Sequence, residues 1–507
     1  MLGTANKTTE RTRRSVDLIH YPSFLVSGAR SVANSLLYLT GLRRKPLLLE
    51  GGRHGDVYRN WSGDRRHRVD WAEPESEEEL VELIRSARSV RVVGSGHSFN
   101  DALACDGLTV SLDRLCGIVA VDLSTRRATV RAGTRLRDLT GALWDRGLAL
   151  RSLASHDAQS IGGILATDVH GTGRDPAHFS DQVVGLRLVD GTGTVHVLAP
   201  DDDLFGAAVG GLGAVGIITE VTVQCVDAFN LVQSTDVRSL DWTRTNLDRL
   251  MEENDHVSFY AYPFTDKVHA HTWDRTDNPP TFGGRIREAL NEAKAVVAAA
   301  VVGDAAAHLG VLPWTAPVAM RLQTPIALVH RAHEAFNRTQ YHLHQELELA
   351  VPREQVWDRL RELIDLYEAL YRSGRFRSGR RLPFLLIEVR FSPAGHDTTL
   401  LGAGVDRETA WLCLCCNQSG AVGRYFAAVE DWARGNEARV HLGKWCESFD
   451  VNDVARMHGE RFRRFRRLQA EADPNGIFVN PFVERLFAPV SSLGAEGQKA
   501  NSSNGTA

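Results

Sequence analysis

A glycine-rich segment directly after an apolar run is the first place where residue types and spacing indicate chemistry. Val92 and Val93 precede the run Gly94-Ser95-Gly96-His97-Ser98. Two glycines after a strand let the backbone approach a ligand closely, and successive N–H groups can hold an anion such as a phosphate. His97 would then face whatever this turn binds, although a histidine after glycine can also be a capping or surface group.

A second segment, from 153 to 173, is rich in small residues. It reads Leu153-Ala154-Ser155-His156, then Ser160-Ile161-Gly162-Gly163-Ile164-Leu165-Ala166-Thr167, then His170-Gly171-Thr172-Gly173. Small side chains leave room for a large flat ligand, while backbone N–H groups and hydroxyls supply hydrogen-bond donors. The alternative is a glycine-rich turn without a ligand. So many glycines would weaken a core, however, unless something fills the space.

Two polar groups in the C-terminal part of the chain could act on a substrate. The strand-like run 385–391 contains Glu388 and Arg390, which the alternation of a strand places on one face. Such a pair can bind a hydroxyl group or can be a simple surface ion pair. Further on, the run His441-Leu442-Gly443-Lys444 supplies a second cation.

In their order along the chain, these segments resemble the vanillyl-alcohol-oxidase superfamily, which has a PCMH-type FAD-binding domain. The similarity is to its aldonolactone oxidase and alditol oxidase branch, which includes D-arabinono-1,4-lactone and L-gulonolactone oxidases. It covers residues 65–487. The matching motifs are G-S-G-H-S (94–98), S-x-G-G-x-x-A-T-x-x-H-G-T-G (160–173), G-A-V-G-I-I (213–218), E-V-R-F (388–391), H-L-G-K (441–444) and D-P-N-G-I-F-V-N (473–480).

The resemblance implies that the cofactor is FAD, with His97 bonded to the flavin 8α-methyl group as in the family. Asp168 departs from the family pattern, because close relatives often have glycine there, and this affects the expected shape of the loop. The residues that the resemblance assigns to FAD binding are Gly94, Ser95, Gly96, His97, Ser98, Ser155, Ser160, Gly163, Ala166, His170 and Ile218.

The resemblance also implies the reaction, which is oxidation of a hydroxyl of a sugar-derived lactone by hydride transfer to flavin N5. Electrons would then pass to O2 or another acceptor. Negative charge that develops on the flavin and on the substrate oxygen requires fixed cations. We expect Lys444 and Arg390 to supply them, with Glu388 holding Arg390 and the substrate in place, and we expect no metal ion.

The substrate class depends on a cysteine-rich strand, 411–416. Cys413 and Cys415 take the places where alditol oxidases carry His and Thr that touch the polyol. Because thiols are poor hydrogen-bond partners, a lactone or another less hydroxylated substrate is favoured. The cysteines can equally be core residues of an alternating strand. His342, His344 and Glu348 are further polar candidates, although the two histidines can also be capping or surface groups.

Three other functions compete with lactone oxidation. The first is an alditol (polyol) oxidase of the same fold. The second is a flavin reductase fed by NADPH, against which His97 argues. The third is a flavin-binding protein without activity, against which the retained Glu388, Arg390 and Lys444 argue.

The elements around these motifs predict an α+β fold. Ser76 precedes a helical pattern with Leu80, Leu83 and Ile84 on one face. A hairpin is expected where two β runs flank Asp190 and Gly191. Gly94-Ser95-Gly96-His97 is not G-x-G-x-x-G and no helix pattern follows it, so a classical dinucleotide-binding fold is disfavoured. The predicted strands are 90–93, 108–112, 118–121, 128–130, 184–188, 195–198 and 217–223, and a helix is predicted at 136–144.

A chain of 507 residues exceeds one ordinary core and predicts several domains. We expect a variable N-terminal extension (1–64), a two-subdomain PCMH-type FAD-binding domain (65–228), an α+β substrate domain (229–472), a C-terminal segment that packs on the FAD-binding domain (473–488) and a disordered tail (489–507).

Composition sets the remaining expectations. A net charge of −4 predicts no general affinity for nucleic acid. Seven cysteines without a disulfide or zinc spacing suggest reduced thiols and a cytoplasmic location. The basic N-terminal extension leaves membrane association or an organelle as the alternative. The apolar stretch 296–312 is too short and too polar for a membrane span, and we expect a buried or interfacial helix.

Overall fold

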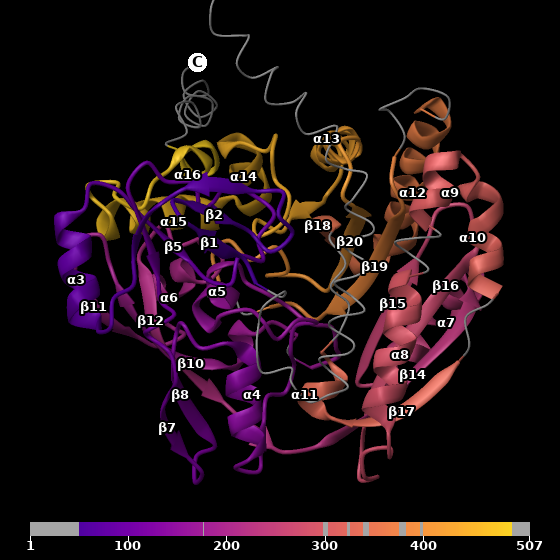
Figure 1. The fold of residues 1–507 in the computed structure, drawn as a ribbon, viewed down its shortest axis with the longest axis horizontal. Coiled ribbons are helices and arrows are strands. Elements are labelled where there is room, and N and C mark those ends of the chain that lie inside the picture. Colours follow the sequence, from indigo (N-terminus) through magenta and orange to yellow (C-terminus); the bar gives the residue numbers. More distant parts are fainter. Residues whose placement is uncertain are drawn as a thin grey trace, which may run out of the picture.

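A computed structural model describes residues 50–175, 177–297, 303–321, 325–337, 344–374, 382–395 and 399–488. Most of the predicted N-terminal extension, the predicted tail and His342 lie outside these residues. Figure 1 shows the elements before residue 228 on one side of the molecule and a large sheet, formed by later residues, on the other.

The N-terminal part contains four small sheets. The largest is antiparallel with the strand order β11-β10-β12-β8-β7, and it includes the predicted hairpin as β10 and β11. Its helices are α3 (Glu77–Ser86), α4 (Leu136–Trp144), α5 (Ile161–Ala166) and α6 (Asp203–Ala208). The strands are β1 (Gly52–His54), β2 (Val57–Arg59), β3 (Arg66–Arg68), β4 (Asp70–Ala72), β5 (Val90–Val93), β6 (Leu108–Ser111), β7 (Ile118–Asp122), β8 (Arg127–Arg131), β9 (Leu148–Ala149), β10 (Val183–Val189), β11 (Val195–Leu198), β12 (Ile217–Gln224) and β13 (Val226–Asp227).

One parallel crossover brings the first glycine-rich segment to its place. Strands β4, β6 and β5 form a parallel sheet, with α3 between β4 and β5. The Ser76 side chain caps α3 by accepting from the Glu79 N–H, and three glutamates in the first turn suit the helix dipole. Leu80 and Ile84 are buried beneath it, as predicted. No helix of the described residues begins between β5 and α4.

The later residues form one eight-stranded antiparallel sheet in the order β17-β14-β16-β15-β19-β20-β18-β21. Helices α7, α12 and α13 contact it, and α8 contacts its edge strand β17. The strands are β14 (Asn230–Ser239), β15 (His256–Ala261), β16 (Lys267–Thr276), β17 (Ile326–Arg331), β18 (His344–Pro352), β19 (Leu385–Ser392), β20 (Thr409–Asn417) and β21 (Arg439–Val440). The helices are α7 (Leu240–Glu253), α8 (Gly284–Val297), α9 (Asp304–Leu309), α10 (Leu312–Arg321), α11 (Ala332–Ala335), α12 (Val356–Gly374) and α13 (Val422–Arg434).

Alternation along β18 separates the two faces of the large sheet. Leu347 and Leu349 are fully buried in the core that α12 and α13 complete. Glu346 and Glu348 alternate with these leucines in sequence and therefore point to the opposite face. That face is directed toward the N-terminal sheets, since its side chains line a pocket together with residues of the 153–173 segment.

The chain returns to the N-terminal sheets at its end. Helices α14 (Val451–His458), α15 (Glu460–Ala472) and α16 (Pro481–Phe487) lie over them in Figure 1. The N–H of Val90 donates to Ile477 O at 2.7 Å, and the fully buried Arg91 guanidinium donates to Phe478 O and Leu212 O. The end of the chain is thus hydrogen-bonded to the strand that carries the first glycine-rich segment.

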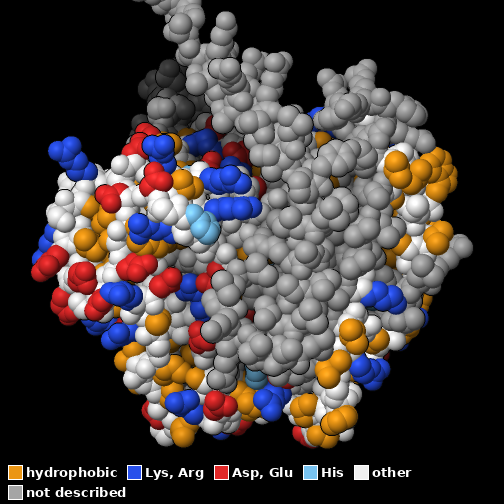
Figure 2. Space-filling model, in the orientation of Figure 1, with side chains coloured by type: hydrophobic (Ala, Val, Ile, Leu, Met, Phe, Trp, Pro, Cys, Tyr) orange, Lys and Arg blue, Asp and Glu red, His pale blue; other side chains and the backbone are white. Residues whose placement is uncertain are grey.

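Apolar side chains are exposed on part of the face that Figure 2 shows. Figure 2 shows charges of both signs mixed over the N-terminal elements, and apolar side chains over α9 and α10. Leu309, Trp314 and Val318 are more than half exposed there. The predicted helix at 296–312 is divided among the end of α8, α9 and the start of α10, and 298–302 lie outside the described residues. Among the helices that are described, none has the length and apolarity to span a bilayer.

Asn480 provides a test of the C-terminal return. Its side-chain nitrogen donates to the carbonyls of Asp101, Ala102 and Ala104, and its oxygen caps α16 at the Val483 N–H. We expect Asn480→Ala to destabilise the protein by about 2–4 kcal/mol, because a cap and several buried hydrogen bonds are lost together. Urea unfolding measures this. Asn278→Ala, at an exposed side chain, should leave the midpoint unchanged; equal midpoints for both variants would contradict the expectation.

Candidate active site

Three pockets adjoin one another, and one of them lies between the N-terminal part and the large sheet. The central pocket is bordered by residues 92–98 and 159–167, the inner pocket by 213–218 and the sheet pocket by the polar face of the large sheet. The central and inner pockets share Gly94, Ser160 and Gly163. The central and sheet pockets share Gln159, Val169, His441 and Lys444. The three therefore form one connected site.

The glycines of the first segment are required by close packing as well as by the pocket. A Cβ at Gly94 would meet Ser160 Oγ at 2.3 Å, and one at Gly96, whose φ is +70°, would meet Tyr58 Oη at 2.4 Å. The Ser160 N–H also donates to Ser95 Oγ at 3.2 Å. These contacts hold the first and second segments together, so that both line the central pocket.

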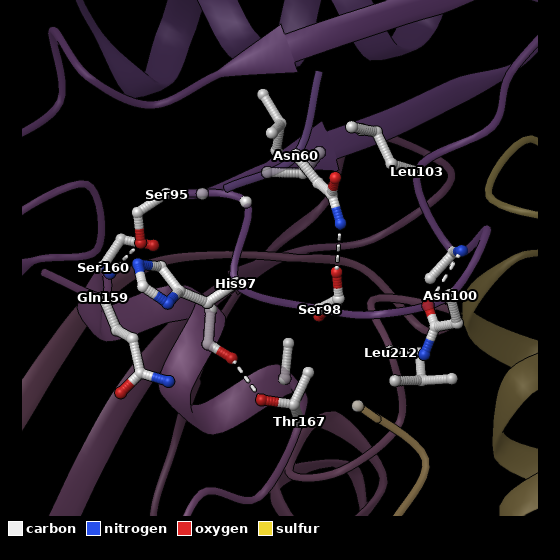
Figure 3. A pocket seen from close by; sticks show the side chains of 18 of the residues that line it. Asn60, Ser95, His97, Ser98, Asn100, Leu103, Gln159, Ser160, Thr167 and Leu212 are labelled. Atoms are coloured by element: carbon white, nitrogen blue, oxygen red, sulfur yellow. Dashed lines mark hydrogen bonds between the residues drawn. The ribbon is translucent and has the colours of Figure 1, made fainter. Parts of the chain in front are cut away.

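His97 lies on the wall of the central pocket, beside Gln159 and Ser160 (Figure 3). Its ring stacks on Trp61, with centroids 5.2 Å apart and planes 10° apart. The ring of His156 is 5.9 Å away on another side. Burial, followed by the neighbouring His97, lowers the pKa of His156 well below its usual value. The contact with Trp61 fixes the plane of the His97 imidazole.

The central pocket is suited to an anionic dinucleotide. Its lining includes Arg65, Arg91 and Lys444, and no Asp or Glu among the described residues. Tyr58 Oη and Gln159 Oε1 are buried there without a hydrogen-bond partner in the described part of the chain. A cationic pocket with small walls and polar atoms still to be satisfied fits a diphosphate and a flat ring system. The residues present therefore fit FAD.

The inner pocket continues this space between small residues. Gly213 and Gly216 line it, each with a positive φ, together with Ile218 at the start of β12. Arg135 is the second arginine of its wall, beside Arg91. Glu50 and Asp113 both form ion pairs with Arg135, and they hold its guanidinium in place.

The sheet pocket owes its polar face to the strand register. Glu388 on β19 is paired with Cys413 on β20, which is paired with Glu348 on β18. Two residues along, Cys415 on β20 is paired with Glu346 on β18. Residues at paired positions, and those two apart on one strand, share a face. These five side chains, with Arg390, all line the sheet pocket.

Arg390 is anchored mainly by Glu348. A buried, charge-assisted hydrogen bond joins Arg390 to Glu348 Oε1, whereas its closest approach to Glu388 is 3.9 Å. Burial alone would raise the pKa of Glu348, but Arg390 and then His170 hold it well below the usual range. Burial and Arg390 lower the pKa of His170 to about 3. The site thus contains a charged Arg390–Glu348 pair beside a neutral His170.

Lys444 is anchored in the same way by the neighbouring glutamate. Its ammonium is hydrogen-bonded to Glu346 Oε2, and His344 Nε2 lies 2.8 Å from Glu346 Oε1. Burial alone would lower the pKa of Lys444, but Glu346 outweighs it and raises that pKa. The backbone supports this position, because the N–H groups of His441 and Trp445 donate to the carbonyls of Glu348 and Glu346. Each cation of the pocket therefore has its own buried carboxylate.

The two cysteines of β20 face the same pocket. Cys413 Sγ and Cys415 Sγ are 3.7 Å apart, and Cys415 Sγ is 3.5 Å from Glu346 Oε1. The hydrogen bond to Cys415, and then burial, raise the pKa of the Cys413 thiol well above its usual value. Both thiols are consequently neutral in the free protein. Of the two interpretations left open by the sequence, the pocket-facing one matches their positions.

The structure brings the predicted site residues into the connected site. Those in the central pocket are Gly94, Ser95, Gly96, His97, Ser98, Ser160, Gly163, Ala166 and Lys444; Ile218 is in the inner pocket; Ser155, His170, Glu388, Arg390 and, again, Lys444 are in the sheet pocket. Sequence reasoning missed Glu346, Gln159 and Trp61. Of these three, only Glu346 could have been found from the sequence. It alternates with leucines in the same strand pattern as Glu348, which places both glutamates on one face.

The backbone at Asp168, where the resemblance led us to expect glycine, has an unusual conformation. Its φ is +50°, in the left-handed region that L residues other than Asn and Asp rarely adopt. The buried carboxylate accepts from Ser180 Oγ at 3.0 Å and lies 3.3 Å from His178 Nδ1. The loop keeps the shape that glycine would allow, and these two partners hold the carboxylate.

Two family models match the chain. A "FAD binding domain" matches residues 71–199, and "D-arabinono-1,4-lactone oxidase" matches residues 221–486. Together with the fold and the connected pockets, these matches define a FAD-dependent oxidoreductase that acts on CH–OH donors. The chain belongs to the D-arabinono-1,4-lactone oxidase family. The resemblance stated from the motifs, the α+β fold class and FAD as the cofactor are confirmed.

Similar proteins cover most of the chain. L-gulono-1,4-lactone dehydrogenase of Mycobacterium tuberculosis strain H37Rv is 31% identical over 443 residues, which are 85% of this chain and 99% of that protein. L-gulonolactone oxidase of Bos taurus is 26% identical, over 82% of this chain and 94% of that protein. A cholesterol oxidase structure from Brevibacterium sterolicum, only 17% identical, aligns with 86% of this chain and 98% of its own at a TM-score of 0.67, which shows the shared fold.

The Arg390–Glu348 pair gives a pH-dependent prediction. The folded-state pKa of Glu348 is depressed, so its ionisation stabilises the fold above the ordinary value of 4.5 and this contribution is lost as pH falls through the folded pKa. We expect Glu348→Gln to lower the free energy of unfolding at pH 7 by about 3 kcal/mol, because Arg390 loses a buried partner. The deficit should shrink toward pH 4.

Urea titrations of both proteins at pH 7 and pH 4 test this prediction. Glu253→Gln, at an exposed glutamate, is the control and should match the wild type at both pH values. A deficit for Glu348→Gln that is absent at pH 7, or that grows in acid, would contradict the assigned pair.

Proposed function

We propose that this enzyme oxidises a hydroxyl of a sugar-derived lactone, with electrons passing to O2 or another acceptor. The observation that carries the proposal is a polar pocket with two cations, Arg390 and Lys444, each held by its own buried carboxylate. This pocket adjoins the central pocket, and Lys444 lines both. The names of the relatives, L-gulono-1,4-lactone dehydrogenase and L-gulonolactone oxidase, support a lactone as substrate.

The central and inner pockets are the proposed place of FAD. Gly94 to Ser98 and Ser160 to Ala166 would hold the flavin and diphosphate, with Ile218 toward the adenosine end. When bound, FAD supplies at N5 the acceptor for the hydride that leaves the substrate carbon. The protein's own part is then to bind the lactone, exclude water and hold charges in place.

The proposed roles of the two cations follow from their positions. Arg390 lies on the large sheet beside Glu388, where it can stabilise negative charge on the substrate oxygen as its proton is lost. Glu388 accepts the hydrogen bond of the reacting hydroxyl, orients it and takes up the proton that the hydroxyl loses. Lys444 lies where the central and sheet pockets meet, so it can balance negative charge on the cofactor side. Glu346 and Glu348 keep both cations fixed before the reaction, which removes a reorganisation cost.

The rest of the sheet pocket favours a lactone over an open-chain polyol. Its wall at β20 presents two neutral thiols, which are weak hydrogen-bond partners. A polyol needs a donor or acceptor for each of several hydroxyls along its length. A compact lactone ring offers fewer hydroxyls and more apolar surface to the same wall.

Anaerobic flavin reduction tests the proposed reaction. We expect L-gulono- or D-arabinono-1,4-lactone to bleach the flavin absorbance, and xylitol and sorbitol to leave it unchanged. Arg390→Leu and Lys444→Met should keep the flavin but slow its reduction by about 100- to 1000-fold, the usual cost of one preorganised partner. Arg249→Leu, at an exposed arginine, is the control. Faster bleaching by polyols than by lactones would favour the alditol oxidase alternative. If either variant reduced its flavin at the wild-type rate, the role assigned to the substituted residue would be wrong.

Covalent attachment of FAD through His97 is a separate proposal. The support is the position of His97 on the central pocket and its fixed ring plane against Trp61. Acid precipitation should leave the flavin with the wild-type protein and release it from His97→Ala. His156→Ala, which removes the neighbouring imidazole, should retain the flavin. Release of FAD from the wild type would refute the linkage.

A further inference from the structure

Two thiols and a carboxylate meet on the polar face of the large sheet. Cys413 and Cys415 are two residues apart on β20, and Cys415 is paired with Glu346 on β18. Their ligand atoms all lie within 4.8 Å of one another. Cys413 is 2% exposed and Glu346 is 7% exposed, so the group lies inside the pocket and not on the surface. Two sulfurs and one carboxylate oxygen are a donor set that Zn²⁺ prefers.

The distances agree with those of a tetrahedral zinc site. With Zn–S bonds of about 2.3 Å, two sulfurs of a tetrahedron lie about 3.8 Å apart, and a sulfur and a carboxylate oxygen about 3.5 Å apart. The Sγ atoms of Cys413 and Cys415 are 3.7 Å apart, and Cys415 Sγ is 3.5 Å from Glu346 Oε1. Two of the three ligand pairs are thus already close to the spacing that the ion requires, and the third pair, Cys413 and Glu346, lies within 4.8 Å.

The charge of the pocket also favours a cation. Its described lining carries three carboxylates, Glu346, Glu348 and Glu388, against Arg390 and Lys444, which gives a net charge of −1. When Zn²⁺ binds two thiolates, it replaces two thiol protons, which pass to solvent, so the net charge stays at −1. Lys444 can remain paired with Glu346 Oε2, because the ion would use the other oxygen.

We propose that Cys413, Cys415 and Glu346 bind one Zn²⁺ ion in the sheet pocket, with water or His344 in the fourth position, and that the bound ion excludes the substrate. No atom of the protein is oxidised or reduced when the ion binds. The ion would occupy the wall against which the proposed lactone lies. Binding of the ion does not depend on the proposed function, whereas exclusion of the substrate rests on it.

A second group of possible ligands in the same pocket is less suitable. His170, Glu348 and His441 also lie within 4.8 Å of one another. Glu348 already accepts from Arg390 through Oε1. A cation placed there would face the Arg390 guanidinium directly. Of the two groups, only the thiol group offers two sulfur ligands, which favour Zn²⁺, so it is the favoured site.

The test uses the flavin-loaded protein, with its cysteines as free thiols, and Zn²⁺ as the only added metal. Competition with a chromophoric chelator should give one tight Zn²⁺ per chain, and X-ray absorption at the zinc edge should show two sulfur ligands at about 2.3 Å. The double variant Cys413→Ser/Cys415→Ser should weaken binding by more than the roughly 10- to 100-fold that loss of an outer partner costs. Cys116→Ser, at an exposed thiol, should bind as the wild type does.

The flavin spectrum and flavin content of each variant show that it has folded. Equal zinc affinity of the double variant and the wild type, or a zinc edge with only nitrogen and oxygen ligands, would overturn the site. Zn²⁺ should also slow flavin reduction by the lactone in the wild type and leave the rate of the double variant unchanged. If Zn²⁺ binds through two sulfurs but no lactone reduces the flavin without the ion, the zinc site holds and the proposed function fails. If the ion binds and reduction is not slowed, exclusion of the substrate is wrong.

Discussion

Two cations held at a buried site depend on two carboxylates that a single strand supplies. An isolated buried ammonium or guanidinium would lose its hydration without compensation, which costs several kcal/mol even after relaxation of the protein. Strand β18 places Glu346 and Glu348 two residues apart on one face, and each pairs with a cation from a different element, Lys444 after β21 and Arg390 on β19. Leu347 and Leu349, which alternate with these glutamates, anchor the opposite face of the same strand in the core. The position of the charges is therefore set by the packing of the sheet.

The cofactor side of the site depends on a different constraint, which is the close approach of the glycine backbone to neighbouring side chains. Gly94 and Gly96 allow the first segment to contact Ser160 and Tyr58 where any Cβ would clash. The central and sheet pockets differ in charge because different parts of the chain line them. Backbone and arginine side chains line the central pocket without carboxylates in its described wall, whereas the large sheet contributes three glutamates to the sheet pocket.

Much of this architecture could be predicted from the sequence, because it is encoded locally. The spacing of apolar residues predicts strand β5 and helix α4, and strand alternation predicts that Glu388 and Arg390 share a face. All three predictions match the structure. The partner of Arg390 could not be found in this way. Glu348 is 42 residues away in sequence and meets Arg390 only through the order of strands in the sheet. Strand order depends on long-range packing that no local pattern contains.

The stacking of Trp61 on His97 could not be predicted either, because it also depends on long-range packing. Trp61 lies outside the predicted FAD-binding domain, which we began at residue 65. It also belongs to no periodic pattern of apolar residues that would predict a helix or strand. Asp168 is the reverse case, in which the family comparison drew attention to the residue but only backbone geometry explained it. A positive φ accommodates the aspartate, and His178 and Ser180 hold its carboxylate.

The threading of the chain has a consequence for the order of biosynthesis. Asn100 donates to the carbonyls of Leu442 and Lys444, and Arg91 donates to that of Phe478, so the walls near the first glycine-rich segment are closed by residues made last. A nascent chain still on the ribosome has the glycine-rich turn but neither Lys444 nor the closing segment. The pocket that we assign to the cofactor is therefore completed only after the C-terminal segment has been made.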